Sequence, residues 1–377
     1  MGTILLIGLG LAGLLGLAVV GAGAWFVLRP QPEVVNNPAP GDEPQTKTGA
    51  LPPLLAPKHR IKTGLKQVGA IFLSADGRRV AVNEYDSTKS HQLEVWDIGP
   101  PHKLVRTFNR VAYALSPDGR VFAVEVDFPG SEVIDVASGN VVSGFRDSRG
   151  NTAAFADKDT LVIASNDATD TGGGKLKVVR YDVNTGRKLG TTDLLDQGTR
   201  AAEEAVVAGA SKELVVAEEK PGLVTVLSMA TGKRVRGAAL AGFPATARVY
   251  KLATSPDGTR MAVTWPVMRG KTHSSDSAVY DTATGAELWS SFDRSIDKML
   301  MPNRDVVLAR TNWMRGGNHF FGWRAYDLRT KAVVADIVAS SDMNAAASAD
   351  GRVLAIGSFP EARSELLVWD LSALPQP

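Results

Sequence analysis

The strongest constraint on this chain is a repeat, with a period of about 40 to 50 residues, that begins after residue 58. Two copies share one pattern: residues 115–124 read LSPDGRVFAV and residues 254–263 read TSPDGTRMAV. Each predicts a strand, a tight turn and a second strand, because Pro, Asp and Gly favour turn positions between apolar runs. Turns of this kind are centred on seven positions, namely 76, 118, 158, 211, 257, 303 and 350.

A second motif follows the first in every unit. It is a short apolar stretch that ends in Asp in most copies, and it lies at residues 95–97, 133–135, 180–182, 226–228, 279–281, 325–327 and 368–370. In most copies a turn such as Thr284-Gly285 comes next, and then another short apolar strand. Each unit therefore contains four strands, which at this period is typical of a β-propeller blade.

The last unit has no fourth strand, because the chain ends at Pro377 soon after residues 368–370. Residues 59–65 (HRIKTGL) lie ahead of the first unit at the offset that residues 104–108 keep ahead of the second. We expect residues 59–65 to supply the outer strand of the seventh blade, which removes an open sheet edge. The sequence thus predicts an all-β fold, a seven-bladed β-propeller over residues 59–377 that is closed by an N-terminal strand.

These units resemble the seven-bladed WD-repeat-like β-propellers of bacterial proteins, and the resemblance covers nearly everything after residue 58. The SPDGR-type turns and the VWD or VYD strands carry it. The sequence departs from the family pattern, since no Gly-His dipeptide precedes any blade and only Trp96-Asp97 and Trp369-Asp370 keep the Trp-Asp pair. The resemblance implies the fold, but propellers host many unrelated functions, so it implies no single activity.

Residues 3–28 contain no charged side chain and predict one transmembrane helix or uncleaved signal anchor ahead of the propeller. Trp25 and Phe26 lie just before Arg29, as is usual where an apolar span meets the lipid headgroups. A cleaved signal peptide is the alternative, because residues 22–24 (AGA) are small enough for a peptidase.

Two further patterns lie within this apolar stretch. Residues 8–13 match the GxGxxG fingerprint, but the apolar run continues where a nucleotide-binding βαβ unit would have to fold, so we expect no cofactor. Gly8, Ala12 and Gly16 recur every four residues, a spacing that would let two such helices pack closely as a dimer. The alternative, which we favour, is the general enrichment of glycine in membrane helices.

Residues 29–58 hold eight of the 20 prolines and predict an extended, semi-rigid linker. Arg29 taken alone favours a cytoplasmic propeller by the positive-inside rule. A retained anchor followed by a Pro-rich spacer and an all-β domain is, however, a common layout for export. We therefore expect a single-pass membrane protein with an extracytoplasmic propeller.

Composition excludes several functions. With 42 Lys plus Arg against 40 Asp plus Glu, the net charge of +2 argues against nucleic-acid binding. The absence of cysteine removes disulfides and thiolate chemistry, and the five histidines lack metal-binding spacing, so we expect neither a metal nor a cofactor.

Binding in loop-bearing scaffolds follows the variable loops, which here join the second and third strands of each blade. In blades five and six we expect these loops at residues 265–275 and 312–318. The loops of blades two to four are acidic, whereas those of blades five to seven combine Arg and Lys with aromatic residues, the composition of interface hot spots. The predicted binding residues, for an acidic protein partner, are Trp265, Arg269, Lys271, Trp313, Arg315, Phe359 and Arg363. A second interpretation has the Trp side chains covering blade edges and the charges merely solvated.

The sequence favours a membrane-anchored interaction or scaffold module and shows no catalytic residue set. Two alternatives stay open. One is a hydrolase or lactonase with a site in the propeller funnel, for which Asp167, Asp170, His273 and His319 are the first residues to examine. The other is a sensor that binds a small molecule or glycan through Trp265 and Trp313.

Overall fold

The computed structural model describes residues 51–84, 92–126, 130–146, 152–167, 175–193, 204–208, 211–218, 220–269, 272–291, 296, 298–315, 317–339, 344–358 and 364–375. The chain divides into two units, Met1–Pro44 and Gln45–Pro377, and every described residue belongs to the second. The predicted membrane span at residues 3–28 lies outside the described residues. Within the described ranges, no helix has the length and hydropathy of a membrane span.

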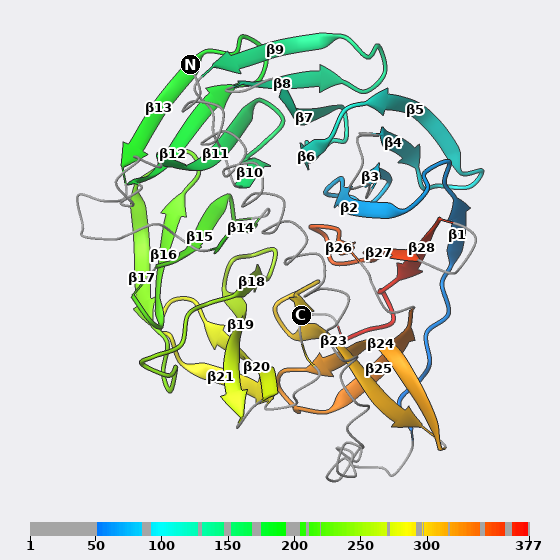
Figure 1. The fold of residues 1–377 in the computed structure, drawn as a ribbon, viewed down its shortest axis with the longest axis vertical. Helices are drawn as coiled ribbons and strands as arrows, with labels where there is room; N and C mark the ends of the chain where they lie inside the picture. The colour runs from blue at the N-terminus through cyan, green and yellow to red at the C-terminus, as the bar shows by residue number, and fades with distance from the viewer. Residues whose placement is uncertain are drawn as a thin grey trace, which may run out of the picture. The chain divides into compact units, whose positions relative to one another are not determined.

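Seven four-stranded sheets surround a central axis in chain order (Figure 1). This confirms the predicted seven-bladed β-propeller. From the inside outward, blade one is β2 (Val68–Leu73), β3 (Arg79–Glu84), β4 (Gln92–Asp97) and β5 (Lys103–Asn109); blade two is β6 (Ala112–Leu115), β7 (Val121–Val126), β8 (Gly130–Asp135) and β9 (Val141–Arg146); blade three is β10 (Thr152–Phe155), β11 (Thr160–Asp167), β12 (Lys175–Asp182) and β13 (Lys188–Asp193).

The remaining four blades repeat this order. Blade four is β14 (Glu204–Ala208), β15 (Glu213–Ala217), β16 (Leu223–Ser228) and β17 (Arg234–Ala239); blade five is β18 (Lys251–Thr254), β19 (Arg260–Arg269), β20 (Thr272–Asp281) and β21 (Glu287–Ser291); blade six is β22 (Lys298–Leu300), β23 (Val306–Arg315), β24 (Asn318–Asp327) and β25 (Val333–Val338); blade seven is β26 (Ala345–Ala347), β27 (Val353–Ser358), β28 (Glu365–Asp370) and β1 (His59–Lys62).

The ring closes where the sequence predicts. Strand β1 pairs with β28 in antiparallel register from His59↔Val368 to Lys62↔Glu365. The strand is shorter than the expected 59–65, because the chain then turns and Gly64 donates its backbone N–H to the Glu94 carboxylate at 2.9 Å. Apolar side chains from blades seven and one meet in one cluster that contains Ile61, so burial seals the seam as well as backbone pairing.

Part of the expected linker belongs to the folded unit. Residues 53–55 run parallel to β25, with Leu55 N donating to Asp336 O at 2.8 Å and Asp336 N donating to Pro53 O at 2.9 Å. The indole Nε1 of Trp369 in blade seven donates to Leu55 O at 3.1 Å. The segment thus bridges blades six and seven before β1 closes the ring.

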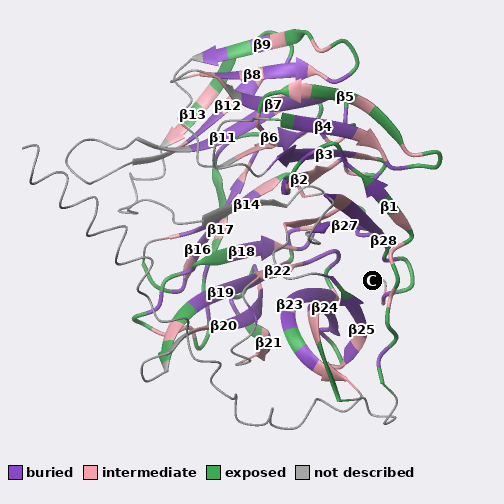
Figure 2. Cartoon of the chain, turned by 45° about the vertical axis from the view of Figure 1, so that its right-hand side comes forward, coloured by how far each residue is buried: buried purple, intermediate pink, exposed green. Residues whose placement is uncertain are grey.

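Apolar burial lies mainly between neighbouring blades. Figure 2 shows buried residues along the middle strands and exposed residues along outer strands such as β5. One cluster joins Trp289 of blade five to Met299 and Tyr326 of blade six. Since every blade packs its faces against two neighbours, the hydrophobic core of the ring consists of apolar layers between adjacent blades.

The Asp-Gly turns are built by a short side-chain network. In blade five the hydroxyl of Ser255, which is fully buried, donates to Asp257 at 2.6 Å and accepts the backbone N–H of Arg260 at 3.0 Å. Gly258 has φ of +70°, which glycine adopts without steric cost. Matching Ser-to-Asp bonds occur in blades one, two and seven, which confirms the turn-forming role predicted for these carboxylates.

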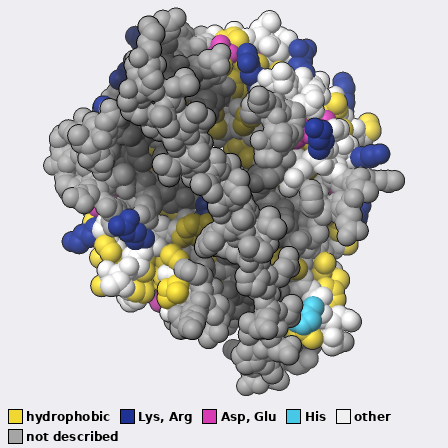
Figure 3. All heavy atoms as spheres, in the orientation of Figure 1, with side chains coloured by type: hydrophobic (Ala, Val, Ile, Leu, Met, Phe, Trp, Pro, Cys, Tyr) yellow, Lys and Arg dark blue, Asp and Glu magenta, His cyan; other side chains and the backbone are white. Residues whose placement is uncertain are grey.

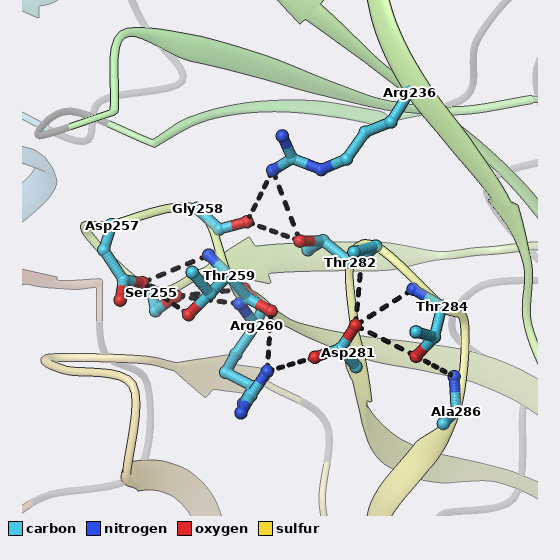
Figure 4. A network of polar contacts seen from close by, with 11 residues as sticks. Arg236, Ser255, Asp257, Gly258, Thr259, Arg260, Asp281, Thr282, Thr284 and Ala286 are labelled. Atoms are coloured by element: carbon cyan, nitrogen blue, oxygen red, sulfur yellow. Dashed lines mark hydrogen bonds and ion pairs between the residues drawn. The ribbon is translucent and has the colours of Figure 1, made fainter.

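These turns also connect neighbouring blades (Figure 4). Arg236 on β17 of blade four donates to the Gly258 carbonyl of blade five at 3.0 Å and to the Thr282 hydroxyl at 3.3 Å. Glu213 holds the same guanidinium through two bonds of 2.6 and 2.7 Å. A bidentate ion pair that also reaches the next blade fixes the angle between the two sheets.

Antiparallel order gives the propeller two distinct faces. The turn face carries the connections between first and second strands and between third and fourth strands, such as residues 255–260 and 281–287. The loop face carries the connections between second and third strands and from each blade to the next. The hydrogen bonds just described constrain the connections of the turn face. The connections of the loop face are therefore the ones that can differ in length and sequence between blades.

Candidate interaction surface

The loop face is extended by two long hairpins in neighbouring blades. Strands β19, β20, β23 and β24 each have 10 residues, whereas the second and third strands of the other blades have 5 to 8. The β19–β20 ladder continues to Arg269↔Thr272, and the β23–β24 ladder continues to Arg315↔Asn318. The blade-five and blade-six hairpins therefore project as paired backbone.

The loops predicted at residues 265–275 and 312–318 are corrected by this pairing, since most of both segments is strand. The alternating burial of successive side chains explains why these segments are strands and not loops. Trp265 is buried, Pro266 is exposed, Val267 is half-buried and Met268 is exposed, which is the period of a strand with one covered face.

Trp265 lies inside the molecule rather than on its surface. Its side chain is 4% exposed and its ring centroid is 4.9 Å from that of Phe243, on the connection that crosses from blade four to blade five. Leu240, Ala247 and Val249 of that connection share the same apolar cluster. Trp265 therefore fixes the base of the blade-five hairpin.

Trp313 plays the same part in blade six. It is 6% exposed, stacks on Phe320 with centroids 6.1 Å apart, and has the Arg324 guanidinium carbon 5.1 Å from its ring centroid. These contacts hold the two strands of the hairpin together through aromatic and cation–π attraction. Their positions agree with the interpretation in which the Trp side chains cover blade edges.

Arg315 is tied to a buried carboxylate. Its Nη1 lies 3.5 Å from Asp336 Oδ2, while Arg324 Nε donates to Asp336 Oδ1 at 3.0 Å. Asp336 is fully buried, so two guanidinium groups compensate its charge. Arg315 consequently anchors the blade-six hairpin to β25.

The other predicted binding residues are less fully described. Arg269 is the last residue of β19. Lys271, Phe359 and Arg363 lie outside the described residues. That these seven residues bind a partner stays a prediction.

Side chains that do reach the surface of the hairpins were missed by sequence reasoning. Met268 is 59% exposed on β19, and Asn318 and His319 are exposed on β24. The alternation from residue 265 onward was the signal available, because it places position 268 on the uncovered face. Among the described residues, the exposed surface of the hairpins is thus formed by side chains such as Met268 and His319 rather than by Trp265 and Trp313.

Charge by itself does not mark the surface. Figure 3 shows Lys and Arg side chains at several places around the margin of one face, with hydrophobic side chains among them. On the turn face, carboxylates such as those of Asp182 and Asp281 accept hydrogen bonds within their own turns. Hydrogen bonds from the hydroxyl and backbone of Thr185 lower the pKa of Asp182. Burial acts to raise the pKa of Asp281, but hydrogen bonds from Thr284 outweigh it and lower the pKa overall. Such carboxylates serve as turn caps.

Of the residues singled out for an enzyme, only His319 has a described side chain. His319 is exposed on β24, Asp167 and His273 lie in β11 and β20, and Asp170 lies outside the described residues. Among the residues that the structure describes, no three His, Cys, Asp or Glu side chains are grouped so that they could hold a metal ion.

We compared the chain with protein-family models and with curated proteins. The chain matches no protein-family model and no curated protein.

Proposed function

We propose that this chain is a single-pass membrane protein whose β-propeller serves as a protein-interaction or scaffold module, with the partner bound on the loop face by the hairpins of blades five and six. The observation that carries the proposal is the pair of hairpins in adjacent blades, each built from two ten-residue strands. The closed ring, with apolar layers between its blades and hydrogen bonds across its turn face, holds the two hairpins in a fixed arrangement. A partner that binds preorganised hairpins loses less conformational entropy than one that must order them.

Exposure of the hairpins supports the same proposal. Met268 presents a large, adaptable apolar side chain, and methionine is enriched at interfaces. Trp265 and Trp313, buried below, keep the projections from collapsing. Residues 3–28 would hold the propeller near an extracytoplasmic membrane surface, with residues 29–50 as the spacer.

The test is affinity capture of the full-length protein from its native membranes. Because Trp313 is buried, its truncation would disturb folding, so the informative variant is Met268→Glu combined with His319→Glu. The matched control is Arg78→Glu on the turn face, where the side chain is 87% exposed.

We expect one or more partners to be recovered with the wild type and the control and to be lost with the hairpin variant, at an unchanged melting temperature. Equal recovery with the hairpin variant, or no specific partner for the wild type, would refute the proposal.

A further inference from the structure

A second surface lies beside the blade-five hairpin, on the connection from blade four to blade five. Along residues 247–250 the side chains alternate: Ala247 and Val249 are 9% and 4% exposed, whereas Arg248 is exposed and Tyr250 is 57% exposed. Tyr250 N donates to Thr264 O at 2.8 Å, which fixes the segment to β19. We call the exposed residues Arg248, Tyr250 and Lys251 the basic ridge.

The chemistry of the basic ridge is cationic and aromatic. Lys251 Nζ lies 5.0 Å from the centroid of the Tyr250 ring, within the range of a cation–π contact. No Asp or Glu occurs between Leu240 and Pro256, so the basic ridge lies in a stretch of the chain that contains no acidic residue. Since Ala247 and Val249 are anchored in the core, the outward residues are presented by a fixed backbone.

The same chemistry continues into the next blade. Lys251 and Lys298 are the first residues of β18 and β22, the innermost strands of neighbouring blades, so both lie at the loop-face end of those strands. Lys298 is opposite Arg310 in the β22–β23 register, and the Arg310 guanidinium carbon is 5.9 Å from the Phe321 ring centroid. A lysine therefore begins the innermost strand of each of these two blades, and in blade six a cation–aromatic pair lies on the strands next to it.

We propose that the basic ridge binds an acidic peptide segment of the protein partner, with carboxylates at Arg248 and Lys251 and the methylene groups of an acidic side chain against the Tyr250 ring. The inference rests on the proposed function and names the chemistry of its partner. Tyr and Arg dominate hot spots because they combine contact area with hydrogen bonding, and an exposed cation speeds encounter with an acidic chain. Binding is non-covalent and reversible.

The experiment uses the full-length protein in detergent micelles and a fluorescein-labelled hexaglutamate peptide as the probe, followed by fluorescence anisotropy at low salt. The variants are Arg248→Glu with Lys251→Glu, and Tyr250→Ala alone. Arg78→Glu on the turn face is the matched control. We expect the peptide to bind the wild type and the control equally, and about tenfold or more weakly to both ridge variants. Binding should also weaken as salt is raised.

Several results would overturn the inference: no binding of hexaglutamate to the wild type, equal binding to the ridge variants, or a twelve-residue oligothymidylate or inorganic phosphate that binds the ridge as tightly as the peptide. The two proposals fail separately. Loss of partner capture in the hairpin variant without ridge-dependent peptide binding would keep the proposed function and reject the ridge. Ridge-dependent peptide binding without any captured partner would support the ridge and reject the proposed function.

Discussion

At the scale of single residues, the turn face is held by buried hydroxyls that each satisfy two groups. Ser255 donates to the Asp257 carboxylate and accepts the Arg260 N–H, while the hydroxyl and backbone N–H of Thr259 also donate to Asp257. Replacing the Ser255 hydroxyl leaves the Arg260 N–H without this acceptor, which costs more than the bond's net contribution to stability.

We therefore expect Ser255→Ala to lower the free energy of unfolding by about 1–3 kcal/mol, measured by urea denaturation. Lys62→Ala, at an exposed site, should change it by less than about 0.5 kcal/mol. A Ser255→Ala protein as stable as the wild type would show that the turn does not depend on the hydroxyl.

A second residue-scale effect concerns pH. The rings of His59 on the closing strand and His102 in blade one are edge to face, with centroids 4.6 Å apart. Burial lowers the pKa of His59, His102 and Lys58 add to the lowering, and Asp370 opposes it. The folded state thus binds fewer protons than the unfolded state, so stability is complete above the ordinary histidine pKa of about 6.5 and declines as pH falls below it.

We expect the denaturation midpoint to fall between about pH 7.5 and pH 5.5, and His59→Gln to reduce that fall. His319→Gln, on the exposed end of β24, should keep the wild-type pH dependence. Identical pH profiles for His59→Gln and the wild type would contradict the assignment of this effect to the closing seam.

At the scale of strands, β1 carries the closure of the ring. Ile61 is 2% exposed and shares a cluster with Val80 and Val82 of blade one and Val368 of blade seven. Truncating it removes contacts on both sides of the seam and leaves a cavity there.

Ile61→Ala should lower the free energy of unfolding by about 2–5 kcal/mol in urea denaturation. Arg60→Ala changes the same strand at a side chain that is 64% exposed and should have little effect. If both substitutions have equally small effects, β1 does not contribute to the stability of the ring.

The strands also show which parts of the fold could be predicted from the sequence and which could not. The blade count and the closing strand were predictable, because Ser-x-Asp-Gly turns and apolar alternation are local signals. The contact of residues 53–55 with β25 was not, since a Pro-rich composition reads as linker and only Trp369 and Asp336, far along the chain, define it.

The candidate site was predicted only in part. Sequence placed an interaction surface on blades five to seven and chose Trp265 and Trp313 for their residue type. Burial of those indoles depends on Phe243 and Phe320, and such pairs cannot be read from composition. Tyr250 and Met268 are exposed because their neighbours in alternation face the core.

At the scale of the whole molecule, a predicted membrane span at residues 3–28 precedes the closed ring. Two charges placed within that span should prevent stable insertion, since each costs about 2.5–3.5 kcal/mol near the membrane centre. We expect the wild type to resist carbonate extraction from membranes and Leu15→Arg with Val19→Arg to be extracted. Resistance of both proteins, or extraction of both, would be incompatible with a single-pass anchor.

In the proposed function, the partner contacts the hairpins of blades five and six. The most direct test places a photoreactive benzoyl-phenylalanine at position 268 or at position 78 of the full-length protein in its native membranes and identifies the cross-linked proteins. We predict a discrete cross-linked species from position 268 and none from position 78. Cross-linking to the same protein from both positions, or from position 78 alone, would contradict it.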